Sequence, residues 1–191
     1  MIILASASPR RSELLRNASI PFQVKPAHVP EFPEKGEKPL DYCRRLARDK
    51  ARKVYTESPG CFVLGADTIV IADDHILEKP KDAEDATRML RMLSGRTHQV
   101  STGVCLIGPD GDGGTFEDVS SETTQVTFAE MTEPEIRAYV ASGEPNDRAG
   151  SYAIQENASR WAKSLQGCYF NVVGLPVPLV YQMLKRRGAI G

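Results

Sequence analysis

Several features are scarce in this sequence of 191 residues, and each scarcity excludes a class of protein. Acidic and basic residues nearly balance, 25 against 24, so the net charge of −1 provides no broad field for a nucleic acid polymer or a membrane surface. No apolar run approaches the roughly 18 residues of a membrane-spanning helix, so no span is expected. The N-terminus lacks a basic segment followed by a long apolar one, so we expect no signal peptide and a cytoplasmic protein.

Cysteine is also rare, and its four occurrences are widely spaced. No two of them have the close spacing of zinc ligands, and each lies in an otherwise apolar stretch. This pattern favours reduced thiols in the core of a cytoplasmic protein over disulfides or a zinc site. The residues are Cys43, Cys61, Cys105 and Cys168.

The rest of the composition is typical of a globular protein. Hydrophobic residues make up 41% and charged residues 26%, and the length allows one domain, residues 1–191, with a sizeable core. Apolar runs bounded by turn residues predict strands at 1–5, 62–72, 75–77, 99–107 and 117–128, and residues 21–26 should form an extended segment. Capping and proline signals predict helices at 39–57, 82–93, 132–141 and 176–187, and another that begins near residue 10. This order predicts an α/β fold with a mixed, partly antiparallel sheet.

The predicted N-terminal strand is followed by small hydroxyl residues, a proline and two arginines where a helix should begin. Free backbone N–H groups and the helix dipole favour an anion at such a position. The forked guanidinium groups of Arg10 and Arg11 are suited to phosphate. The segment is therefore either an anion site or an ordinary capped surface helix with solvated arginines.

Asp67 interrupts an apolar run that should be a buried strand. An ionised carboxylate in such a place is costly unless it is paired or binds a metal ion. Asp67 is therefore either a functional residue or a residue at the sheet edge that bonds to a neighbouring loop.

Two lysines also stand out by position. Lys50 lies on the apolar stripe of the predicted 39–57 helix, four residues after Leu46. Its ammonium either enters a site or extends to solvent at the margin of the stripe. Lys79 follows the predicted 75–77 strand, so it either faces a ligand at the end of the sheet or belongs to an ordinary charged loop.

A series of blocks that spans nearly the whole chain resembles the Maf family, the nucleoside triphosphate pyrophosphatases also called septum-formation inhibitors. The blocks are Ala5-Ser6-Ala7-Ser8-Pro9-Arg10-Arg11, Leu46-Ala47-Arg48-Asp49-Lys50-Ala51, Gly65-Ala66-Asp67-Thr68, Glu78-Lys79-Pro80, Leu93-Ser94-Gly95-Arg96-Thr97-His98, Ala149-Gly150-Ser151-Tyr152-Ala153-Ile154-Gln155 and Val172-Val173-Gly174-Leu175-Pro176. Any one block is weak, but their shared order is highly specific. The resemblance implies an ITPase-like fold, in which helices flank a mixed sheet and a cleft separates two lobes.

The resemblance also implies a reaction, in which water cleaves the bond between the α- and β-phosphates and leaves a nucleoside monophosphate and pyrophosphate. Asp67 would accept the proton of that water, and Glu31 would join it around a divalent cation, Mg²⁺ or Mn²⁺. Arg11, Lys50 and Lys79 would hold the triphosphate, because positioning and charge stabilisation carry phosphoryl chemistry.

The resemblance further assigns the remaining candidate residues. Ser6 and Ser8 would help to hold the phosphates at the first helix, and Arg10 would lie nearer the base or sugar. Arg10, Thr68 and Gln155 match the branch that acts on thymidine and uridine nucleotides, whereas the methylated-guanosine branch has tryptophan, glutamine and glutamate there. The chain therefore looks like a dTTP/UTP pyrophosphatase, and a glutamine amide matches the donor and acceptor edge of thymine or uracil.

One stretch departs from the family pattern. Glycine and small residues usually follow the Ile-Gln pair, but this chain continues with the segment Glu156 to Leu165. Glu156 lacks the conformational freedom of glycine, so we expect a differently shaped loop beside the base, which puts base selectivity in question. Trp161 is either a stacking platform or a buried hydrophobic anchor.

Two other functions stay open at this stage. One is a pyrophosphatase for another base, such as 7-methyl-GTP, and the other is a non-catalytic nucleotide-binding regulator of septum formation. The complete set of charged candidates favours an enzyme, because a pure binder has no need for all of them. That set is Arg11, Glu31, Lys50, Asp67 and Lys79. The resemblance also suggests a homodimer, with neither a nucleic acid polymer nor a membrane as partner.

Overall fold

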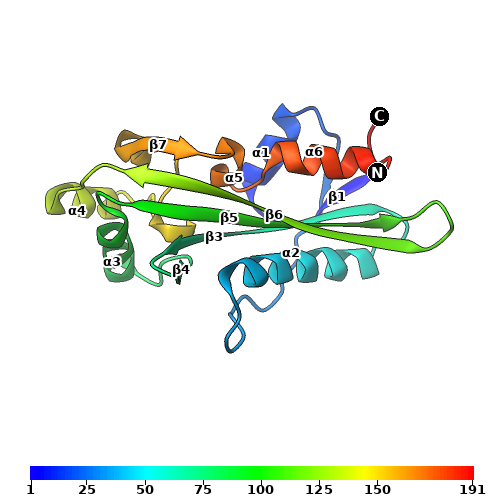
Figure 1. Ribbon diagram of the computed structural model, residues 1–191, viewed down its shortest axis with the longest axis horizontal. Coiled ribbons are helices and arrows are strands. Elements are labelled where there is room, and N and C mark those ends of the chain that lie inside the picture. The colour runs from blue at the N-terminus through cyan, green and yellow to red at the C-terminus, as the bar shows by residue number, and fades with distance from the viewer. The chain divides into compact units, whose positions relative to one another are not determined.

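The computed structural model describes residues 1–191 and contains both helices and strands (Figure 1). The strands are β1 (Ile2–Leu4), β2 (Gln23–Val24), β3 (Phe62–Ala72), β4 (His75–Leu77), β5 (Thr97–Pro109), β6 (Thr115–Phe128) and β7 (Ala162–Gln166). The helices are α1 (Pro9–Asn17), α2 (Pro39–Thr56), α3 (Ala83–Leu93), α4 (Glu133–Ala141), α5 (Tyr169–Val173) and α6 (Val177–Arg186). Two short 3₁₀ helices cover Ala149–Ser151 and Asn157–Trp161.

The strands hydrogen-bond in the order β2-β1-β3-β5-β6-β7, and β4 pairs with β3. β1 is parallel to both β2 and β3, whereas β3 and β4, like β6 and β7, are antiparallel. This confirms the prediction of a mixed, partly antiparallel sheet. Every predicted strand and helix is present, with ends shifted by a few residues.

The chain divides into two compact units. The first comprises Met1–Asp67, Thr102–Glu122 and Gly174–Gly191, and the second comprises Thr68–Ser101 and Thr123–Val173. The cleft and the single domain that the sequence suggested stay predictions. No helix in the structure has the length and apolar character needed to cross a bilayer.

In the first unit, α2 lies against β3 at a distance that only glycine permits. A Cβ atom on Gly65 would lie 2.1 Å from the carbonyl oxygen of Ala47 and 2.8 Å from the amide nitrogen of Ala51. Lys50 lies between these two helix positions, so the close approach brings its side chain to the middle of β3, where Asp67 lies. The glycine therefore helps to build the candidate site described below.

We predict that Gly65→Ala destabilises the protein, because the new methyl group must push α2 away from β3. Overpacking of this kind costs about 1–3 kcal/mol of the free energy of unfolding, which chemical denaturation measures. Gly111→Ala is the matched control, since a Cβ there meets nothing within 4 Å. Equal stability of the two variants would contradict this account of the helix–sheet packing.

Capping groups and an aromatic cluster order the second unit. Asp82 caps α3, as predicted, because its side chain accepts a hydrogen bond from the amide of Asp85 at 2.8 Å. The rings of His98, Phe128 and Tyr152 meet edge to face, and the Tyr152 hydroxyl lies 2.8 Å from Nε2 of His98. Burial lowers the pKa of His98 to about 4, so this histidine is a neutral core residue.

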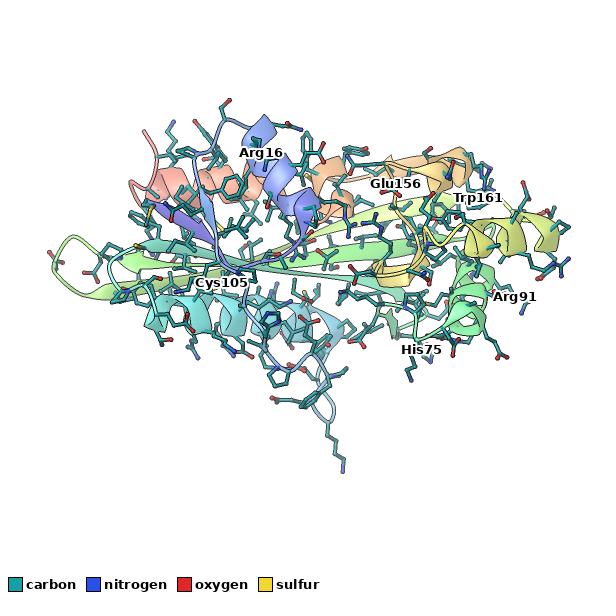
Figure 2. The ribbon with its side chains drawn as sticks, turned by 180° about the vertical axis from the view of Figure 1, so that it is seen from behind. Arg16, His75, Arg91, Cys105, Glu156 and Trp161 are labelled. Carbon is teal, nitrogen blue, oxygen red and sulfur yellow. The ribbon has the colours of Figure 1, made fainter.

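Two of the open alternatives are settled by burial. All four cysteines are free, as predicted: Cys43 and Cys105 are buried, the latter on β5 (Figure 2), whereas Cys61 and Cys168 are only half-buried. Trp161 is 3% exposed and packs edge to face on a buried tyrosine of α4 (Figure 2). It is therefore the buried anchor and not an exposed stacking platform.

Candidate active site

The loop between β1 and α1 is held together by hydroxyl and guanidinium groups. Ser6 is buried, and its Oγ accepts hydrogen bonds from the Ser8 amide at 3.2 Å and from Nη1 of Arg11 at 3.1 Å. Ser8 precedes the first turn of α1 but makes no side-chain capping bond, and Arg10 is half-buried. Ser8 therefore occupies the N-cap position without a side-chain capping bond, and the anion site at this segment stays a prediction.

Arg11 connects three segments that are distant in the sequence. Its Nε donates to the carbonyl oxygen of Gly174 at 2.8 Å, and its Nη1 donates to that of Ala66 at 2.9 Å. Burial lowers the pKa of Arg11, while the nearby carboxylates of Asp67 and Glu31 oppose the change. Arg11 is therefore a half-buried positive charge beside the middle of β3, held by backbone carbonyls, and the interpretation as a solvated arginine is wrong.

The most unusual group in the first unit is a lysine between two carboxylates. Nζ of Lys50 lies 2.7 Å from Oδ1 of Asp67 and 2.6 Å from Oε1 of Glu31. The Lys50 side chain is 9% exposed, so it does not extend to solvent, and Asp67 is 11% exposed. Glu31 comes from the loop between β2 and α2 and is half open to solvent. The structure thus brings together residues from a strand, a helix and a loop.

The surroundings of Asp67 change its pKa. Burial raises its pKa above the ordinary value of a carboxyl group, while Lys50 and Arg11 oppose the rise. A raised pKa makes a carboxylate a stronger proton acceptor, and such shifts concentrate at functional sites. The alternative interpretation of Asp67, a residue at the sheet edge that bonds to a neighbouring loop, does not account for this buried ionic group.

The donor set can be tested against a divalent cation. Mg²⁺ prefers oxygen ligands and is usually held by one or two carboxylates together with substrate phosphates and water. Glu31 and Asp67 meet this requirement, because both carboxylates contact one ammonium and Glu31 is accessible. No cluster of three or more histidine, cysteine, aspartate or glutamate residues in the structure could hold a metal ion by itself. The residues therefore fit a cation that arrives with a phosphorylated ligand.

The other predicted residues lie in the second unit. Thr68 is half-buried and follows Asp67 directly. Lys79 is 60% exposed and forms an ion pair with Asp147, which is 79% exposed. Gln155 is exposed in the turn before the second 3₁₀ helix. The roles of these residues stay predictions.

The turn that carries Gln155 is held by one ion pair and by hydrogen bonds from Asn157 to Glu144. Glu156 has φ −111°, which any residue adopts, so this position does not need the conformational freedom of glycine, and a loop shaped differently from that of the family stays a prediction. Its carboxylate accepts a hydrogen bond from Nη2 of Arg148 at 2.7 Å, and Asn157 Nδ2 donates to Glu144 at 2.7 Å (Figure 2). The Glu156 carboxylate is therefore occupied by an arginine.

Two residues that contact the candidate residues or their elements, Gly65 and Asp147, were not predicted from the sequence. Gly65 belongs to a recognised block, but its packing role depends on a helix that lies elsewhere in the chain. Asp147, the partner of Lys79, has φ 61°, and no sequence signal marked it beyond its place in a turn between charged residues.

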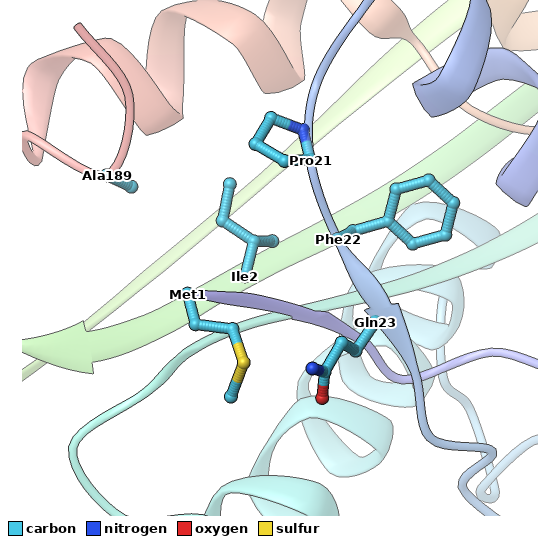
Figure 3. Close-up of a pocket in the computed structure, with 6 residues that line it drawn as sticks. All are labelled: Met1, Ile2, Pro21, Phe22, Gln23 and Ala189. Carbon is cyan, nitrogen blue, oxygen red and sulfur yellow. The ribbon is translucent and has the colours of Figure 1, made fainter.

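A pocket of about 310 Å³ opens elsewhere on the first unit (Figure 3). Its walls come from β1, β2 and the end of the chain, namely Met1, Ile2, Pro21, Phe22, Gln23 and Ala189. None of the candidate residues lines it, and it offers no charged side chain. It is therefore not the anion site.

Comparison with known proteins gives a consistent set of matches. A family model described as "Maf-like protein" matches residues 1–187. A curated "dTTP/UTP pyrophosphatase" of Koribacter versatilis (strain Ellin345) is 58% identical over 189 residues, which cover 99% of this chain and 95% of the relative. One of the same name from Geobacter sp. (strain M21) is 50% identical over 190 residues, covering 100% and 97%. The solved structure of the Staphylococcus aureus Ham1 protein matches 97% of this chain and 98% of that one, with a TM-score of 0.53 and 15% identity, and thus shows the fold alone.

Proposed function

This chain belongs to the Maf family, and we propose that it is a nucleoside triphosphate pyrophosphatase that hydrolyses dTTP and UTP. The observation that carries the proposal is the buried Lys50 between the carboxylates of Asp67 and Glu31, beside the guanidinium of Arg11. Such a site combines a proton acceptor with positive charge for phosphates. The names of relatives at 50–58% identity support the choice of substrate.

In the proposed reaction, Asp67 removes a proton from water as the water oxygen attacks the α-phosphorus. The new bond joins that oxygen to phosphorus, and the bond to the oxygen bridging the α- and β-phosphates breaks, so pyrophosphate leaves. A divalent cation held by Glu31 and Asp67 would neutralise phosphate charge. Arg11 and Lys50 add fixed positive charge in a largely buried place, where electrostatic stabilisation is most effective.

In the second unit, we assign Lys79 to the phosphates and Thr68 and Gln155 to the base. In the first unit, we assign Ser6 and Ser8 to the phosphates at the start of α1, where helix geometry favours phosphate, and Arg10 to the base or sugar. A cytoplasmic homodimer is the form that the family resemblance predicts, and light scattering after gel filtration tests the dimer.

A panel of nucleoside triphosphates tests the function. Pyrophosphate release from dTTP, UTP, 7-methyl-GTP and the common purine triphosphates is measured with the purified chain and Mg²⁺ or Mn²⁺. We expect dTTP and UTP to have the highest kcat/KM. A preference for 7-methyl-GTP would support the other base class, and no turnover of any triphosphate without added partners would support a binding protein.

The pKa of Asp67 predicts an acid limb in the pH profile. A general base works only when it is deprotonated, so kcat/KM for dTTP should fall as the pH drops through the pKa of this residue. Because burial raises that pKa, the midpoint in the free enzyme should lie above the ordinary aspartate value of about 3.9. An acid limb centred at or below that value would contradict the assignment.

Lys79→Ala should lower kcat/KM by roughly 100-fold, because it removes a positive charge assigned to the phosphates. The loss should be similar for dTTP and UTP, since the phosphates are common to both. Lys81→Ala is the control, because Lys81 is an exposed lysine of the same loop. A variant that changes only the preference among bases would show that Lys79 has been given the wrong role.

A further inference from the structure

The carboxylate of Glu31 comes from a loop without helix or strand structure, which we call the Glu31 loop, residues 25–38 (Figure 1). The loop is rich in proline and acidic residues, and most of its side chains are exposed. Such a segment pays an entropy cost whenever it holds one conformation. A carboxylate that must stay beside Lys50 therefore needs the loop to be fastened by other residues.

Basic residues of α2 fasten this loop at several points. Arg45 donates to Glu37 through Nε at 2.6 Å and through Nη2 at 2.8 Å, a two-point contact that fixes both side chains. The same Nη2 donates to the carbonyl oxygen of Phe32 at 3.0 Å, and Phe32 is the residue directly after Glu31. On the other side of Glu31, Nζ of Lys53 donates to the carbonyl oxygen of His28 at 2.5 Å.

Glu37 closes a turn within the loop while it holds Arg45. Its carboxylate accepts the amide N–H of Glu34 at 2.9 Å, and its own amide donates to the Glu34 carbonyl at 3.0 Å. The side chains of Glu37 and Arg45 are 10% and 17% exposed, so solvent screens this ion pair less than a fully exposed one. The hydrogen bond from Arg45 also lowers the pKa of Glu37, which keeps the pair charged at neutral pH.

We propose that Arg45, locked by Glu37, is a positioning residue that holds the Glu31 carboxylate at Lys50 and Asp67, in the place where a divalent cation and its triphosphate bind. The inference rests on the proposed function, because that function gives Glu31 its role. Arg45 acts only through the loop. Partners that orient a metal ligand are commonly worth about 10- to 100-fold in metal affinity or activity.

The first part of the test concerns the loop alone and needs no substrate. Hydrogen–deuterium exchange of peptides covering residues 25–38 is measured in the metal-free protein. Arg45→Met and Glu37→Gln should both exchange faster than wild type in this segment, and Arg45→Lys should lie between, because it keeps the charge but loses the fork. Arg52→Met is the matched control, since Arg52 is also on α2 and makes a two-point contact, but with Glu117 of β6.

The second part measures the Mg²⁺ concentration that gives half-maximal dTTP hydrolysis. We expect an increase of about 10-fold for Arg45→Met, a similar shift for Glu37→Gln, and a kcat at saturating Mg²⁺ close to that of wild type. Arg52→Met should leave the Mg²⁺ dependence unchanged. A purely structural role for Arg45 would lower the melting temperature without changing this dependence.

Two results would overturn the inference: unchanged exchange in Arg45→Met, or faster exchange with a wild-type Mg²⁺ dependence. Failure of the proposed function has a different signature, because wild type itself would then hydrolyse neither dTTP nor UTP. In that case the exchange data still decide whether Arg45 and Glu37 order the loop.

Discussion

The Asp67→Asn protein is expected to be folded and almost inactive. The substitution keeps the shape of the side chain and an oxygen that can accept the hydrogen bond of Lys50, but it removes the proton acceptor. General bases contribute about 10²- to 10⁴-fold, and loss of a carboxylate from the proposed cation site adds to the effect, so kcat for dTTP should fall by at least about 100-fold. Pyrophosphate release under saturating dTTP and Mg²⁺ measures this loss.

Stability should move in the opposite direction. The pKa of Asp67 is raised in the folded state, so the folded protein binds a proton more readily than the unfolded chain does. Ionisation of Asp67 at neutral pH therefore opposes folding, and the neutral asparagine should hold or raise the melting temperature. Lys50 keeps Glu31 as an anionic partner at 2.6 Å. Wild type should regain stability as the pH falls through the raised pKa, and the variant should not.

Asp118→Asn provides the control, because Asp118 is another carboxylate of the first unit and pairs with Arg187 away from the candidate site. It should retain activity and lose a little stability at neutral pH, since the arginine lowers the pKa of Asp118. Substantial turnover by a folded Asp67→Asn protein would eliminate the proposed base.

Charges in apolar surroundings were the part of the site that could be predicted from the sequence. Asp67 interrupts a buried strand, and Lys50 interrupts the apolar stripe of a helix. Burying a charge in either place costs desolvation free energy, which a partner must offset. The structure shows that they offset one another, with Nζ and Oδ1 2.7 Å apart. The sequence patterns predicted each residue as unusual, but not that the two would meet.

Glu31 could not be chosen in this way. It lies in a loop with other glutamates, including Glu34 and Glu37, and no periodicity distinguishes one from another. Only the family resemblance selected Glu31, and only the three-dimensional contacts show that Glu37 has a different use, as the partner of Arg45. Loops lack the regular spacing on which sequence interpretation depends.

The contacts of Arg11 were beyond sequence reasoning for another reason. Its acceptors are backbone carbonyls of Ala66 and Gly174, and a backbone carbonyl has no signature in the sequence.

β7 and α5 were missed because they are short, and β7 has mostly exposed side chains without alternation. β7 follows from its pairing with β6 and not from a local pattern.

Gln155→Glu should change which bases the protein accepts while leaving the phosphate chemistry in place. A glutamine amide can donate to a carbonyl of thymine or uracil, whereas a carboxylate only accepts and repels that carbonyl. Polar mismatch is penalised far more than apolar mismatch, so kcat/KM for dTTP and UTP should fall by about 100-fold or more. A guanine-type base presents ring N–H and amino donors, so 7-methyl-GTP should lose less or gain. Gln166→Glu, at an exposed position of β7, controls for the added charge.

The neighbouring Glu156 is a second residue that could contact the base, and a variant of it distinguishes its role from that of Gln155. If its carboxylate read the base, wild type would already prefer 7-methyl-GTP, and Glu156→Gly would remove that preference. The structure instead ties this carboxylate to Arg148 at 2.7 Å, so Glu156→Gly should loosen the turn and lower kcat/KM for both pyrimidine substrates without changing their rank against 7-methyl-GTP. Relative kcat/KM for UTP, dTTP and 7-methyl-GTP in wild type and both variants decides between the two residues. A ranking that Gln155→Glu leaves untouched would show that Gln155 does not read the base.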